Sequence, residues 1–424
     1  MNRHSLSRLL GAGLIVLASC GPAGAADEAQ RLGVASCASS TCHGRVSPAN
    51  NSYAQLNEYF LWSKYDRHAQ AYRTLEGDWS KRIAANMGIA DAARAPECLV
   101  CHSDYVPEAQ RGPRFQLRDG VGCEACHGSA SGYIDAHYGP DASHAENIAL
   151  GLTPSENPRV QAQICQSCHV GDKQRLVTHE IMAAGHPRLR FELDTWLTNM
   201  PVHHSEDADY AQRKGITNGA DRWAAGIAAA AVDYMDMLQA HLDGHSLTPE
   251  LGLFDCHACH RPMDTTVRRT SGEKWLTPAG SIRPNDYAIR TLAVVAGLRD
   301  AALADRISQQ NRTLHRSTSQ SVARFKNRSA DLRDTLTRAQ AVVASRPLSA
   351  SERAAVRRAL LQTASEGYFR DYADAEQLFL ALQALAAVSE ADRAGQYDRL
   401  FGLLTNEQNF KPSRVAAEAG SLLR

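Results

Sequence analysis

The chain has 424 residues, the length of two ordinary domains or of one large one. Lys and Arg total 46, as do Asp and Glu, so the formal net charge is zero, which argues against a general nucleic-acid binder. Hydrophobic residues at 44% and charged residues at 22% indicate a folded protein rather than a disordered one. Aromatic residues, at 6%, are a thin supply for a core of this size, whereas eleven Cys and 17 His are the outlying numbers.

The N-terminus has the pattern of a secretory signal peptide. Two arginines precede an apolar run over residues 9–18, which is shorter than the roughly 20 residues of a membrane span. The small residues at 23–25 form a cleavage site, so we expect residues 1–26 to be removed and the protein to be exported to the periplasm. The segment L-A-S-C that ends at Cys20 also resembles a lipobox, and cleavage there would leave a lipid tether through Cys20.

The remaining ten cysteines form five pairs, and each pair ends in a histidine. Four pairs are C-x-x-C-H, and the first pair in the chain has four residues between its cysteines. This is the signature of covalent attachment of haem c, because thiols at i and i+3 lie on one side of a helical turn and can reach both vinyl groups of one porphyrin. The histidine at i+4 then faces the iron as the proximal ligand. The expected attachment residues are Cys37, Cys42, Cys98, Cys101, Cys123, Cys126, Cys165, Cys168, Cys256 and Cys259, and the expected proximal ligands are His43, His102, His127, His169 and His260.

Three other uses of these cysteines explain the pattern less well. Disulfides are common in exported proteins but do not require a histidine after every pair. The second and third pairs together mimic a zinc ribbon, which would leave three pairs unexplained. A redox C-x-x-C is expected once rather than five times. The wider first pair needs a bulged loop but can close the same two thioethers. The sequence therefore predicts five haems.

A low-spin electron carrier needs a second axial ligand on each iron, usually His or Met. When the histidine of the signal segment, His4, and the five proximal histidines are set aside, eleven histidines remain for five positions, so bis-histidine ligation is possible at every iron. One candidate lies on the apolar face of a helix predicted around residues 59–69, and two others are seven residues apart, about two helical turns, so that both could face inward. The five expected distal ligands are His68, His137, His179, His186 and His203.

The other histidines have weaker positions. One of the adjacent residues His203 and His204 is expected to bind and the other to be solvated. A packed or surface role is at least as good an interpretation for His144, His241, His245, His257 and His315, and Met182, Met200 and Met263 are alternative axial ligands.

All five motifs precede residue 261, and the rest of the chain has helical patterning. A long helix is predicted over 220–242, before the last motif, and others over 286–310, 313–344, 351–365, 371–388 and 391–404. Ser349 and Glu352 form a capping-box pattern. We expect a mainly α protein with little regular strand, divided into a signal peptide (1–26), a pentahaem cytochrome c domain (27–280) and an α-helical C-terminal domain (281–424).

Two segments resemble a known family. The sequence G-V-G-C-E-A-C-H-G at 120–128 is similar to the third-haem signature of the cytochrome c-554 (c554/c-prime) family of periplasmic multihaem cytochromes, and D-R-H-A at 66–69 resembles its distal-ligand segment. The resemblance covers roughly 33–186 and implies a mainly α fold with haems in close stacked pairs. The wide first motif, the fifth motif and the C-terminal helices depart from the family pattern.

Two functions follow from these observations. Members of the family are electron carriers, so the first is a periplasmic pentahaem cytochrome that transfers electrons between periplasmic or membrane redox proteins, without a nucleic-acid partner. The second is an oxidoreductase that acts on a small nitrogen or sulfur compound at a five-coordinate haem, as some relatives of the family do. Because histidines suffice for every site and no C-x-x-C-K motif occurs, the sequence favours the electron carrier.

Overall fold

The computed structural model describes residues 29–49, 55–139, 141–200, 203–204, 206–242, 249–256, 259–260, 282–386 and 395–424. Over these residues the protein is mainly helical, and the only strand-like pairing is two isolated β-bridges. The predicted signal peptide and Cys20 lie outside the described residues, as do His245, His257 and Met263.

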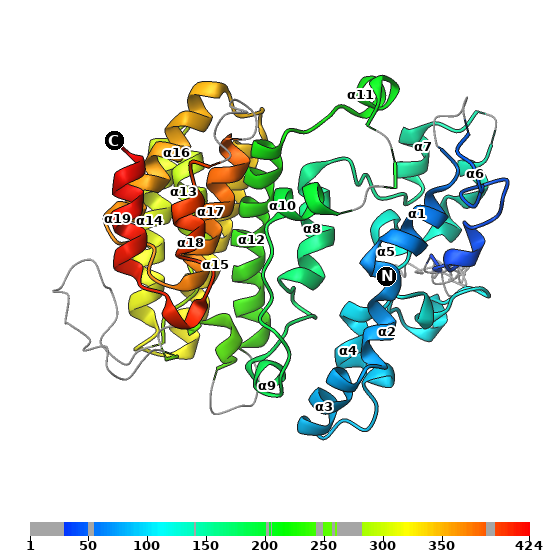
Figure 1. The fold of residues 1–424 in the computed structure, drawn as a ribbon, viewed down its shortest axis with the longest axis horizontal. Coiled ribbons are helices and arrows are strands. Elements are labelled where there is room, and N and C mark those ends of the chain that lie inside the picture. Colours follow the sequence, from blue (N-terminus) through cyan, green and yellow to red (C-terminus); the bar gives the residue numbers. More distant parts are fainter. Residues whose placement is uncertain are drawn as a thin grey trace, which may run out of the picture.

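The helices divide visibly into two groups (Figure 1). Short helices of the first half, among them α4 and α5 with the second and third motifs, lie at one end of the molecule, and longer helices form a bundle at the other. The bounds are α1 Glu58–Tyr65, α2 Ala71–Leu75, α3 Asp78–Asn86, α4 Pro96–His102, α5 Cys123–His127, α6 Ile134–His137, α7 His144–Ala149, α8 Pro158–His169, α9 His179–Ala183, α10 Leu193–Asn199, α11 Ala208–Lys214, α12 Gly219–His241, α13 Tyr287–Gly297, α14 Ala301–Ser317, α15 Val322–Ala344, α16 Ala350–Ser365, α17 Tyr372–Ala386, α18 Asp398–Gly402 and α19 Pro412–Leu422.

Helix α12 is the centre of the bundle. The side chain of Asn218 caps its N-terminus by accepting a hydrogen bond from the backbone N–H of Asp221 (3.1 Å). Its small and apolar residues are buried almost all round, as expected for a helix enclosed by others. It packs against α13, α15 and α17 on the C-terminal side and against α8 and α10 on the motif side. Helix α12 therefore connects the two groups.

The buried apolar core is concentrated in the bundle. One continuous cluster includes residues of every helix from α12 to α19. In contrast, the clusters among the motif-bearing helices are small, and one of them consists of Leu75, Ala84, Ala92, Ala93 and Leu99. The core of α12 thus runs across residue 280, where the sequence predicts a domain boundary, and that boundary stays a prediction.

Most predicted helices of the bundle are correct in kind, but two differ at breaks, and of the span predicted as 391–404 only Asp398–Gly402 is helical among the described residues. The span predicted as 286–310 is divided between α13 and α14, because Asp300 accepts a hydrogen bond from the backbone of Leu303 and starts a new helix. The span predicted as 313–344 begins at Val322, after a turn that Ser321 caps. The capping box at Ser349 and Glu352 is present. Helix α19, which begins at a proline, was not predicted.

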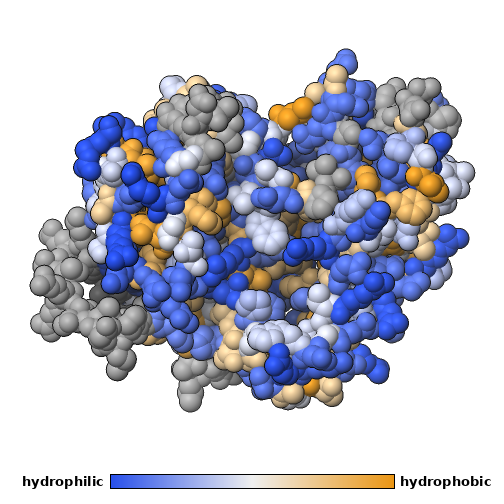
Figure 2. Space-filling model, viewed as in Figure 1, coloured by the Kyte–Doolittle hydropathy of each residue, from blue (hydrophilic) through white to orange (hydrophobic). Residues whose placement is uncertain are grey.

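The face seen in Figure 1 is mostly hydrophilic, and hydrophobic atoms show in the hollow between the two groups of helices (Figure 2). Over the described residues, no helix combines the length and the apolar character that a membrane crossing requires.

Candidate functional site

Three of the five motifs lie at the ends of short helices. Helix α5 consists of the third motif alone, and α4 and α8 end at the histidines of the second and fourth motifs. Prolines at the first helical positions, Pro96 and Pro158, fix where α4 and α8 begin. Gly128, with φ +83°, ends α5, and a Cβ there would lie 2.5 Å from the carbonyl oxygen of Gly151. The expected single helical turn is therefore present.

The first and fifth motifs form tight turns of different size. In the fifth motif the backbone N–H of His260 donates to the carbonyl of Cys256 (2.7 Å), the bond of a single helical turn. In the first motif the N–H of His43 donates to the carbonyl of Cys37 (3.0 Å), which closes a wider loop over the two extra residues. The predicted bulge thus keeps cysteine and histidine on one turn.

Each of the five motif histidines faces a second histidine that is distant in the sequence. The ring centroids lie 5.9–6.4 Å apart in all five pairs. The five second histidines are the five that the sequence predicts as distal ligands. The pairs and their interplanar angles are His43 with His137 (21°), His102 with His186 (83°), His127 with His203 (89°), His169 with His68 (81°) and His260 with His179 (34°).

These separations fit one metal ion between each pair of rings. Metal–nitrogen bonds to histidine are about 2.1 Å long, and each nitrogen lies roughly 1.1 Å from its ring centre, so two axial imidazoles have centroids about 6 Å apart. Rings in direct stacking contact would be closer. The donor set, two thiols and two imidazoles at each position, is that of haem c with bis-histidine ligation.

Several of these rings are oriented by hydrogen bonds through Nδ1. His43 donates to Glu58 Oε2 (3.0 Å) and His68 to Asp66 Oδ1 (2.9 Å). His102 donates to the carbonyl of Ala71 (3.1 Å), and His186 to that of Pro187 (2.8 Å). Such partners fix the tautomer and leave Nε2 for a metal.

Burial favours the neutral form of five of the ten paired imidazoles, and metal ligation requires that form. It lowers the pKa of His127 and of His169 to about 4. The same cause lowers the pKa values of His102, His137 and His203. The carboxylates of Glu58 and Asp66 instead raise the pKa values of His43 and His68, because each accepts a hydrogen bond from the ring.

Two local predictions about distal histidines are wrong, although the residues themselves pair. His68 is not on the face of α1, because Asp66 adopts an extended backbone conformation that ends the helix and His68 lies in a following 3₁₀ turn. His179 and His186 do not share a helix face either. Helix α9 ends at Ala183, and Gly185 turns the chain with φ +119°, so the two rings face different motifs.

The remaining described histidines have other partners. His204 stacks on Tyr210, with ring centroids 5.2 Å apart, so His203 is the member of the adjacent pair that faces a motif. The Nε2 atoms of the other three are hydrogen-bonded: His144 to Glu156 (2.8 Å), His241 to the carbonyl of Asp172 (3.1 Å) and His315 to Asp286 (3.0 Å).

The cysteine thiols connect neighbouring motifs in space. The thiols of Cys37 and Cys123 interact, as do those of Cys101 and Cys168, so the first motif adjoins the third and the second adjoins the fourth. Cys126 and Cys165 interact electrostatically, which places the third motif beside the fourth. None of the ten cysteines is in a disulfide. Over the described residues no group of three or more His, Cys, Asp or Glu side chains is arranged as a metal cluster.

Three carboxylates of the site were not assigned a role from the sequence. Glu58 is 15 residues from His43, and no local pattern joins them. Asp66 lies in the segment that resembles the family's distal-ligand segment, which was the available signal. Glu124, inside the third motif, is buried and accepts backbone hydrogen bonds from Leu32 and Gly33 (2.8 and 2.7 Å), which ties the start of the described chain to that motif.

Comparison with known proteins agrees with this geometry. Residues 36–128 match the model of the family described as cytochrome c554 and c-prime. The match covers the first three motifs. The comparison with curated proteins and the comparison with solved structures returned no match.

Proposed function

We propose that this protein is an exported pentahaem c-type cytochrome that transfers electrons between redox proteins of the periplasm or its membrane. The observation that carries the proposal is the pairing of five motif histidines with five distant histidines at the spacing of axial ligands. Haem c, when bound, supplies a one-electron iron couple.

The residues of the chain then have defined roles. Ten cysteines would supply the thioethers, and the motif histidines would supply one proximal imidazole for each iron. The five distal imidazoles would come from segments far along the chain, so ligation would stabilise the tertiary structure as well as set the spin state. The interactions between thiols of different motifs support electron transfer along a series of haems, because they show that neighbouring motifs adjoin.

Export and partners belong to the same proposal. The signal-peptide pattern over 1–26 supplies the route to the compartment in which haem is attached, and the lipobox ending at Cys20 supplies a tether if cleavage occurs there. The partners would be periplasmic or membrane-bound electron donors and acceptors.

Haem counting and ligand replacement test the proposal. Mass spectrometry of protein exported from a host with haem-attachment machinery should show five covalent haems, and a lower count contradicts the pentahaem proposal. In H68A we expect all five haems to remain attached while one iron becomes high-spin and binds carbon monoxide. The matched control is H144A. In the wild-type protein Nε2 of His144 is hydrogen-bonded to Glu156, so this variant should leave every iron low-spin. A wild-type protein with one high-spin iron would favour the oxidoreductase instead.

Electron paramagnetic resonance tests the pairing itself. Crossed axial imidazole planes give strongly anisotropic low-spin signals, whereas nearly parallel planes give rhombic ones. The angles near 80–90° at the second, third and fourth motifs predict three signals of the first kind. The angles of 21° and 34° at the first and fifth motifs predict two of the second kind. Five signals of one kind would contradict these ligand pairs.

A further inference from the structure

A cavity of about 210 Å³ lies between the motif-bearing helices and the bundle. Cys256 of the fifth motif and His169 of the fourth both line it. One side is apolar and includes Leu176, Val177 and Phe254, and α17 contributes residues to the opposite side. The C-terminal helices, which lie outside the family match, therefore form part of the wall beside an attachment cysteine.

Four charged side chains join the two halves of the molecule at this cavity. Arg190 donates to Glu376 Oε1 (3.0 Å) and to Glu407 Oε2 (2.8 Å). Arg188 Nη2 lies 3.6 Å from Glu376 and 3.9 Å from Glu407. Both guanidinium groups also lie over the ring of Tyr372, at 6.0 and 5.1 Å from its centre. The arginines precede α10, whereas the glutamates and the tyrosine belong to the C-terminal region.

The cluster lines the same cavity as Cys256 of the fifth motif, and the buried carboxyl of Asp371 lines it too. Glu376 is only 18% exposed, so water screens its charge less than it would at the surface. Arg188 Nη2 is buried and makes no hydrogen bond to any described residue.

We propose that the C-terminal helices complete the site of the fifth haem, and that the cluster of Arg188, Arg190, Glu376 and Glu407 sets the redox potential of the iron bound through Cys256 and Cys259. This inference rests on the proposed function. Reduction adds one electron, so carboxylates near the cofactor oppose it and guanidinium groups favour it. Removing one carboxylate from a cluster of two arginines and two glutamates leaves a net positive charge and favours reduction.

The test is a potentiometric titration of the holoprotein at pH 8, well above the ordinary pKa of a carboxylic acid. In E376Q we expect five covalent haems and an upward shift in the midpoint potential of one haem. If E376Q fails to fold, E407Q replaces it in the test, and we expect the same upward shift in the midpoint potential of one haem. In the double variant R190Q/E376Q the net charge is restored, so the shift should be smaller.

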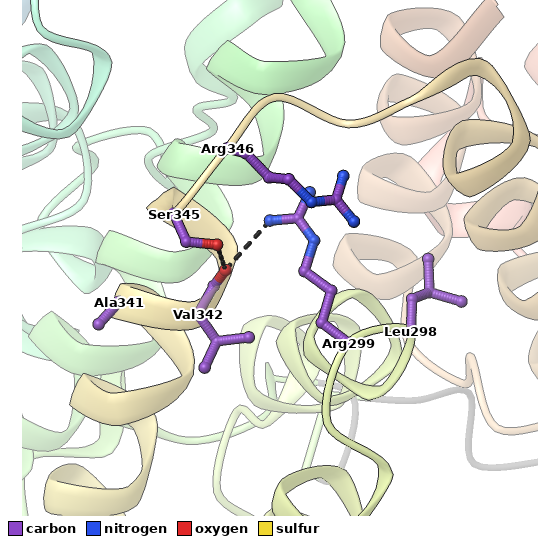
Figure 3. Close-up of a pocket in the computed structure, with 6 residues that line it drawn as sticks. All are labelled: Leu298, Arg299, Ala341, Val342, Ser345 and Arg346. Carbon is purple, nitrogen blue, oxygen red and sulfur yellow. Dashed lines mark hydrogen bonds between the residues drawn. The ribbon is translucent and has the colours of Figure 1, made fainter.

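A control with the same chemistry lies on the bundle at a distance from every motif. Glu352 also binds two arginines, Arg346 (2.7 Å) and Arg299 (3.0 Å). These arginines line a shallow pocket that contains no motif residue, where Arg299 also donates to the carbonyl of Val342 (Figure 3). Because Gln is accepted at the third position of a capping box, E352Q should fold and leave all five potentials unchanged.

A variant that lacks the fifth haem shows which haem is responsible for the shift in midpoint potential. In C256S/C259S, which cannot attach the fifth haem, E376Q should shift no remaining potential. Five intact haems with unshifted potentials in both E376Q and E407Q would overturn the inference and leave the proposed function standing. A shift that persists in C256S/C259S would overturn it as well, because the cluster would then act on another haem. A wild-type protein without haem at Cys256 and Cys259 would instead contradict the pentahaem proposal itself.

Discussion

The motif-bearing helices and the bundle have the same secondary structure but different interiors. The bundle has a continuous apolar core from α12 to α19, as expected of a domain stabilised by its own side chains. The helices around the first four motifs bury only small clusters, rich in alanine. The contacts that join distant segments of this region include the five histidine pairs. The comparison teaches that helices alone do not define a self-sufficient core, and we infer that the first region would need its proposed cofactors for stability.

Removing the haems gives the largest expected difference between the two regions. In protein made without haem attachment, we expect residues 55–204 to become sensitive to limited proteolysis, while α12 to α19 stay protected by their shared core. Mass spectrometry of the fragments locates the cleavage sites. The holoprotein is the control, and equal protection of both regions without haem would contradict the comparison.

A cavity in the bundle should lower stability without affecting the haems. Leu336 is fully buried, so L336A should reduce the free energy of unfolding by about 2–5 kcal/mol. The adjacent exposed Thr337 offers a control, since T337A should change it by less than about 0.5 kcal/mol. Thermal unfolding measures the change, and mass spectrometry should still show the wild-type haem count. Loss of haem in L336A would mean that the two regions do not fold independently.

The stability of the folded protein should depend on pH through the carboxyl group of Asp233 in α12. Burial, together with repulsion from Asp236 and Asp172, raises the pKa of Asp233 to about 7. The unfolded chain has a pKa of about 3.9 for Asp, so the folded state binds more protons between these values. The contribution of Asp233 to stability is therefore greatest below about pH 4, falls as pH rises from about 4 to about 7, and is constant above that. D233N should flatten this fall in thermal unfolding, and an unchanged slope would refute the assignment.

The smallest expected effect concerns one ligand of the first motif. Glu58 accepts a hydrogen bond from Nδ1–H of His43, which makes the other ring nitrogen, Nε2, a more basic ligand for a metal ion. E58Q removes that charge, so one haem potential should rise slightly in a redox titration while all irons stay low-spin. Exposed Glu146 provides the control, because solvent screens its charge and E146Q should leave the potentials unchanged. A fall in potential in E58Q would contradict this role.

Much of the candidate site could be predicted from the sequence because its chemistry is local. Cysteines and a histidine within one turn indicate the expected attachment residues and proximal imidazoles without reference to any long-range contact. Helix α12 and the capping box of α16 were predicted for the same reason, since spacing and capping operate over a few residues. The helix breaks at Asp300 and Ser321 were missed because polar caps competed there with an uninterrupted helical pattern.

Only the tertiary structure decided which residues meet. The sequence indicated His68, His137, His179, His186 and His203 as distal candidates but not their partners, because each pair joins segments that are brought together by packing rather than by spacing. The sequence also did not show that Glu58 lies beside His43. Nor did it show that α17 lies beside Cys256, from which it is more than a hundred residues distant in the chain. Short-range geometry follows from the covalent chain, whereas contacts at such separations depend on how the whole molecule folds.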